Sequence, residues 1–226
     1  MWWWRLCVLC GAAMFWVSSS FALVPGIHGC GLHSDPILAF ELVKTPGELE
    51  RLMPAACRSA MLEAQQAALW IDIVRFVPAY LAVLITCLVA LGRDLGHSST
   101  RAMWVGVLLA VCAAVFDQVE NHRLLQIIAH FPGSQADFAV LIPAVRAKFF
   151  LLSAAIAMIA VLIFRRSDWL RWIGLIMGGS AMLSVYALVA RPHDVVAFSV
   201  PGWLTILVTA IVLSLWRGKS GGMASG

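Results

Sequence analysis

The stretch Ala113-Ala114-Val115-Phe116-Asp117-Gln118-Val119-Glu120-Asn121-His122 closes an apolar run that begins near Met103 and is long enough to cross a bilayer. Asp117, Glu120 and Asn121 are spaced i, i+3 and i+4, so a helix would present all three on one face. Charged and amide groups are costly in hydrocarbon unless they have partners. The stretch therefore predicts a transmembrane helix with a polar site near one end, and other spans that supply its partners.

The composition is typical of an integral membrane protein. The 226 residues are 62% hydrophobic and 12% charged, which is about half the charged fraction of a soluble domain. Mean hydropathy is +0.89. The net charge of +4 comes with basic residues gathered in particular loops, which is an orientation signal of membrane proteins. We therefore expect an all-α, polytopic membrane protein and no nucleic-acid partner.

Six apolar segments predict a six-helix transmembrane bundle. We expect it to form a single domain over residues 1–216, with a flexible Gly/Ser-rich tail at 217–226. The first segment could instead be a signal peptide cleaved after Ser20-Phe21-Ala22; we interpret it as a retained span. Small residues at 178–181 predict close helix packing in the fifth span. The expected spans are residues 5–24, 67–91, 102–121, 138–164, 172–190 and 197–216.

The loops indicate an orientation. Basic residues concentrate in the short loops after the second and fourth spans, which places those loops in the cytoplasm. With six spans, both termini are then cytoplasmic and the long first loop, residues 25–66, faces outside. In that loop Thr45 is expected to cap a helix, Pro46 to take its first position and Glu48 to complete a capping box. A short apolar stripe follows, so we expect an amphipathic helical cap on the membrane surface.

Cys30 and Cys57 are the two cysteines of the outer loop. An oxidising compartment would allow a disulfide between them, worth about 3 kcal/mol by loop-closure arithmetic. Two free thiols are the alternative. Peptide mapping without reductant should recover Cys30 linked to Cys57, whereas recovery of both thiols in free form would reject the bridge.

The expected orientation brings charged residues of three spans to the same depth, in the outer half of the membrane. The second span begins with Asp72 and Arg75, followed by Pro78, which would kink it. The fourth begins with Arg146 and Lys148. We therefore expect a ligand-binding site or ion-pair network of three acids, three bases and an amide: Asp72, Arg75, Asp117, Glu120, Asn121, Arg146 and Lys148. His122, His193 and Asp194 are candidates for a lid or rim.

Several short motifs occur together between residues 38 and 150. They are Phe40-Glu41-Leu42, Thr45-Pro46-Gly47-Glu48-Leu49, Trp70-Ile71-Asp72, Phe116-Asp117-Gln118-Val119-Glu120-Asn121, and Lys148 before a long apolar run. This part of the chain resembles a group of small bacterial inner-membrane proteins that carry an aromatic-Asp-x-x-Glu-Asn motif. The resemblance implies a bacterial inner (cytoplasmic) membrane location and a shared site for these polar positions. It implies no activity.

Carboxylates beside a lysine in a buried site can bind polar groups or move protons. We interpret the chain as a protein that binds or processes a hydrophobic or amphipathic small molecule: a lipid, a quinone or an isoprenoid. A structural or assembly subunit of a membrane complex is one alternative, and an acid/base membrane enzyme acting on a lipid is another. Expected partners are membrane lipids, such a small molecule, and a membrane protein or a second copy of the chain. The sequence identifies no catalytic residue and no cofactor, and His28, Cys30 and His33 match no strong zinc pattern, so no metal is expected.

Overall fold

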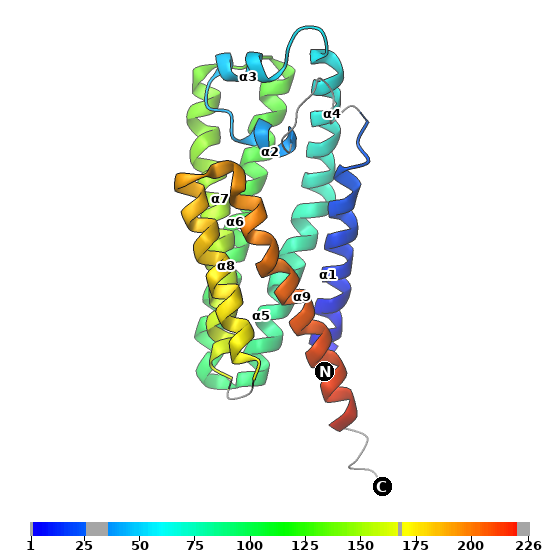
Figure 1. Cartoon of the computed structure of the whole chain (residues 1–226), viewed down its shortest axis with the longest axis vertical. Helices are drawn as coiled ribbons and strands as arrows, with labels where there is room; N and C mark the ends of the chain where they lie inside the picture. The colour runs from blue at the N-terminus through cyan, green and yellow to red at the C-terminus, as the bar shows by residue number, and fades with distance from the viewer. Residues whose placement is uncertain (1, 26–35, 167–168, 221–226) are drawn as a thin grey trace. The chain divides into compact units, whose positions relative to one another are not determined.

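The structure, a computed structural model, describes residues 2–25, 36–166 and 169–220, with side chains up to residue 216. All regular structure in these ranges is helical (Figure 1). Six helical segments in them are long and apolar enough to cross a membrane, which confirms the predicted all-α architecture and supports a multi-pass membrane protein. These segments are Trp2–Phe21, Arg58–Leu95, His97–Ala129, Gln135–Phe164, Arg171–Ala190 and Pro192–Trp216.

The individual helices follow one another along the chain as Figure 1 labels them. The α-helices are α1 (Trp2–Phe21), α2 (Pro36–Glu41), α3 (Pro46–Leu52), α4 (Arg58–Ile71), α5 (Val77–Leu95), α6 (Thr100–Ala129), α7 (Gln135–Phe164), α8 (Arg171–Ala190) and α9 (Val195–Ser220). A π-helical turn, η2 (Asp72–Phe76), joins α4 to α5, and the 3-10 turns η3 (His97–Ser99) and η4 (Pro192–Asp194) precede α6 and α9. Residues 217–220 thus continue α9, and residues 221–226 lie outside the described ranges.

The chain forms two compact units, and each is described by itself. The first unit consists of Met1–Met14, Ala79–Ala113 and Phe149–Gly226, and the second of Phe15–Pro78 and Ala114–Lys148. The single-domain organisation stays a prediction.

In the first unit, α7 and α8 approach closely at Gly174. A Cβ atom at this position would lie 2.9 Å from the carbonyl oxygen of Ala160, whereas one at Gly179 would meet nothing within 4 Å. Among the glycines of α8, the tightest contact is therefore at Gly174, one helical turn before the predicted stretch 178–181. Ser180 of that stretch has another role, because its hydroxyl donates to the carbonyl oxygen of Phe198 at 2.6 Å and thereby joins α8 to α9.

In the second unit, α6 is longer than the predicted span. It continues past Asn121 to Ala129, because Leu124 and Ile127 extend the buried face at helical spacing and are almost fully enclosed. The helix therefore extends over residues 122–129, beyond the predicted span of residues 102–121. The chain turns after Ala129, where Gly133 has a φ of 78° that favours glycine.

The π-helical turn η2 lies just before Pro78. Proline has no N–H, and its ring crowds the carbonyl of the residue four positions earlier in a regular α-helix. In η2 the N–H of Val77 donates to the carbonyl oxygen of Asp72, five residues back. A widened turn that begins at Asp72 thus precedes Pro78, and the kink at Pro78 stays a prediction.

The helix start predicted in the first loop is present as α3. The Thr45 hydroxyl accepts from the N–H of Glu48 at 3.2 Å, and Pro46 occupies the first turn. The Glu48 carboxylate accepts from the N–H of Lys44 at 2.9 Å, one residue before the position that a capping box uses. The predicted disulfide partner Cys30 and the metal-ligand candidates His28 and His33 lie outside the described residues.

Candidate functional site

The second unit holds a buried lysine among carboxylates. Lys148 Nζ on α7 lies 2.7 Å from Glu120 Oε1 and 3.5 Å from Asp117 Oδ1, both on α6. It also lies 3.1 Å from Glu41 Oε2, at the end of α2. Asp117 and Glu120 were predicted to share one face of a helix. On α6 their i, i+3 spacing directs both carboxylates at one ammonium group.

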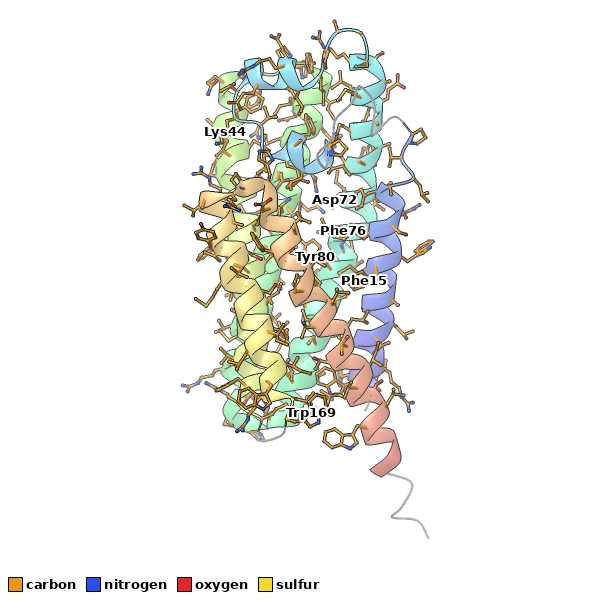
Figure 2. All side chains as sticks on the ribbon, viewed as in Figure 1. Phe15, Lys44, Asp72, Phe76, Tyr80 and Trp169 are labelled. Atoms are coloured by element: carbon orange, nitrogen blue, oxygen red, sulfur yellow. The ribbon has the colours of Figure 1, made fainter. Side chains whose placement is uncertain are left out.

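An amide connects a fourth carboxylate to this group. Asn121 Nδ2 donates to Asp72 Oδ2 at 2.6 Å and to Asp117 Oδ1 at 3.4 Å. Asp72 lies on η2 (Figure 2), and the Gln118 side chain donates to the carbonyl oxygen of Ile73 at 3.3 Å, which holds η2 against α6. We call the group formed by Glu41, Asp72, Asp117, Glu120, Asn121 and Lys148 the Lys148 cluster.

Glu41 reaches the cluster because the short helix α2 is anchored at its other end. The buried Gln65 amide of α4 donates to the carbonyl oxygen of Pro36 at 2.9 Å. Ile37 packs against Ala64 and Ala68 of the same helix. Glu41 was not among the predicted site residues. The signal in the sequence that points to it is its place in the motif Phe40-Glu41-Leu42, which was grouped above with the motif of Asp117 and Glu120.

Two buried acceptors of the cluster have no hydrogen-bond partner among the described residues. They are Glu120 Oε2 and Asn121 Oδ1, and the residues that carry them are 0% and 1% exposed. A buried polar atom left without a partner costs about 1–3 kcal/mol. The two atoms are therefore acceptors that a hydrogen-bond donor would satisfy.

Two predicted members of the network are not in it. Arg75 and Arg146 are exposed, and the ion pairs found within the described ranges do not include either one. Arg75 is turned away because the π-helical turn places residue i+3 off the face of Asp72, whereas a regular α-helix would keep it there. Arg146 precedes Lys148 by two positions, and residues two apart on a helix do not share a face.

The three rim candidates are not part of the Lys148 cluster as defined by its contacts. His122 is exposed on α6, with its ring 3.1 Å from the Gln126 amide. His193 and Asp194 belong to η4, in the first unit. Their role at a rim stays a prediction.

The charge balance of the cluster differs from the prediction. Three acids and three bases were expected to converge, but the contacts above join four carboxylates to one ammonium group. Such a group can hold a proton or a donor-bearing ligand, since carboxylates in a low-dielectric site need compensation. Among the residues that the structure describes, no group of three or more His, Cys, Asp or Glu is arranged to hold a metal ion. Comparison of the chain with family models, curated proteins and solved structures finds no match.

Proposed function

We propose that this membrane protein binds an amphipathic small molecule whose polar end occupies the Lys148 cluster. The observation that carries the proposal is the pair of buried, unpartnered acceptors, Glu120 Oε2 and Asn121 Oδ1. An ion-pair network that only locks helices together gains by satisfying every buried polar atom. Ionisable groups inside membrane spans are also more often functional than structural.

The proposal includes a location and an orientation. We place the protein in a bacterial inner membrane with both termini in the cytoplasm, following the distribution of basic residues in the loops. The Lys148 cluster then lies in the outer half of the membrane, where α2 supplies Glu41 from the outer loop. In this arrangement α3, with the buried side chain of Leu49, serves as an amphipathic cap over the site.

The orientation predicts that Lys44 faces the outside. In cells in which only the outer membrane has been made permeable, a membrane-impermeant amine reagent should therefore reach Lys44. Lys44 is exposed on the link between α2 and α3 (Figure 2). The sequence has two further lysines, the buried Lys148 and Lys219. Lys219 should react only after the inner membrane is opened, and a reporter fused after Gly226 should be cytoplasmic. Labelling of Lys44 that also requires an opened inner membrane would contradict the orientation.

The binding proposal is tested by identifying what co-purifies with the protein. We expect mass spectrometry of the wild-type protein in mild detergent to find an enriched amphipathic molecule that is depleted at least about tenfold in Glu120→Gln, because one charge-assisted hydrogen bond contributes about 1.5–3 kcal/mol. Glu63→Gln is the matched control, since Glu63 is exposed on α4, and should retain the molecule.

Equal small-molecule content in the wild type and in Glu120→Gln would contradict the proposal. If the wild-type protein then also eluted in a tight complex with another membrane protein, the structural-subunit alternative would replace it.

A further inference from the structure

The hydrogen-bond donors of the Lys148 cluster are already directed at its own carboxylates. The Asn121 amide donates to Asp72 and to Asp117, and an amide nitrogen has two hydrogens. Lys148 Nζ lies within 3.5 Å of three carboxylate groups. A ligand that only accepts hydrogen bonds, such as a quinone carbonyl, would have to displace one of these interactions.

The atoms that remain are acceptors. Glu120 Oε2 and Asn121 Oδ1 are both buried and unpartnered, so a group that satisfies them must donate hydrogen bonds. One carboxylate oxygen and one amide oxygen can each accept from a different hydrogen of the same donor group.

The cluster also has more acidic than basic groups. Its acidic groups are the four carboxyl groups of Glu41, Asp72, Asp117 and Glu120, and its basic group is the ammonium of Lys148. A buried charge without a partner is strongly destabilising. Phosphate and carboxylate ligands would add to the excess, and a cation would reduce it.

From these three observations we infer that the ligand of the Lys148 cluster is an amphiphile with a primary ammonium headgroup. This inference rests on the proposed function and narrows it. A primary ammonium brings one positive charge and three hydrogens, which is enough to supply a donor to each of Glu120 Oε2 and Asn121 Oδ1. An alcohol supplies one hydrogen and no charge, and a quaternary ammonium supplies charge without a hydrogen on nitrogen.

The experiment compares four amphiphiles with the same alkyl chain on the full-length protein in phosphatidylcholine nanodiscs. The probes are hexadecylamine, hexadecyltrimethylammonium, hexadecanol and hexadecyl phosphate, and native mass spectrometry measures the amount retained by the protein. The phosphatidylcholine headgroups of the nanodisc should compete little for the site, since choline has no N–H group. Hexadecylamine should bind the wild type at least about tenfold more tightly than each other probe, which corresponds to about 1.4 kcal/mol.

Variants show whether this preference arises in the cluster. The amine preference should disappear in Glu120→Gln and persist in Glu63→Gln. If Glu120→Gln does not fold, Asn121→Leu gives a second test, because it removes the unpartnered Oδ1 without a change of charge, although the amide donors to Asp72 and Asp117 are lost with it.

Each other outcome overturns the inference in a recognisable way. Glu120-dependent binding of hexadecanol or hexadecyl phosphate in preference to the amine would reject the ammonium headgroup but keep a ligand site. Equal retention of every probe by the wild type and Glu120→Gln would reject the inference. If no co-purifying molecule depended on Glu120 either, the proposed function would fail with it.

Discussion

Replacing Lys148 by methionine should lower the free energy of unfolding by roughly 3–5 kcal/mol, the usual cost of breaking a buried ion pair. The substitution keeps most of the side-chain volume and removes the ammonium group that lies within 3.5 Å of Glu41, Asp117 and Glu120. The carboxylates are then left without their cation. Denaturant titration in mixed micelles measures the change, and Lys44→Met, at an exposed position, should change stability by about 0.5 kcal/mol or less.

A second substitution should restore part of this loss. Glu120→Gln in the Lys148→Met background removes the carboxylate nearest the lost ammonium, at 2.7 Å in the native protein. Asp117→Asn should restore less, because its oxygen lies at 3.5 Å. Recovery remains partial in both cases, since other carboxylates stay in the cluster. Purely additive losses in these double-mutant cycles would mean that Lys148 does not interact with the acid in question.

Gly174→Ala should lower the free energy of unfolding by roughly 1–3 kcal/mol, the typical cost of overpacking a tight contact. The new Cβ atom would lie 2.9 Å from the carbonyl oxygen of Ala160 and 3.1 Å from the backbone nitrogen of Phe164. Backbone atoms cannot rotate aside as a flexible side chain can, so α8 would have to move from α7.

The control for this prediction is in the same helix. A Cβ atom at Gly179 would meet nothing within 4 Å, and alanine is a better helix former than glycine by up to about 1 kcal/mol. Gly179→Ala should therefore be neutral or stabilising in the same titration. Equal stability of the two variants would show that α7 and α8 do not approach closely at Gly174.

The parts of the fold that could be predicted from sequence are those set by local pattern. Long apolar runs predict the six spans, because a helix must be apolar over the whole bilayer thickness. The spacing of Asp117, Glu120 and Asn121 predicts their common face, because α6 is a regular helix through this stretch. Lys148 could be predicted as one of their partners because it is a charged residue in an apolar span, but Arg146 of the same span was predicted with it.

The parts that could not be predicted depend on a local irregularity or on a distant contact. The π-helical turn at Asp72–Phe76 changes the direction of Arg75, and the pattern of apolar residues does not indicate where a helix widens. Glu41 and Lys148 are 107 residues apart in the chain. Their contact depends on the anchoring of the six-residue helix α2 by Gln65, which is a tertiary interaction without a sequence periodicity.

The central claim is that the Lys148 cluster holds a ligand, and an experimental density map of the wild-type protein in a bilayer tests it most directly. The map must resolve ordered water around Glu120 and Asn121. We predict density larger than a water molecule, continuous with an alkyl chain, with a donor atom at about 2.7–3.2 Å from both Glu120 Oε2 and Asn121 Oδ1. A map in which these two oxygens contact only water, each other or other groups of the protein would contradict the claim.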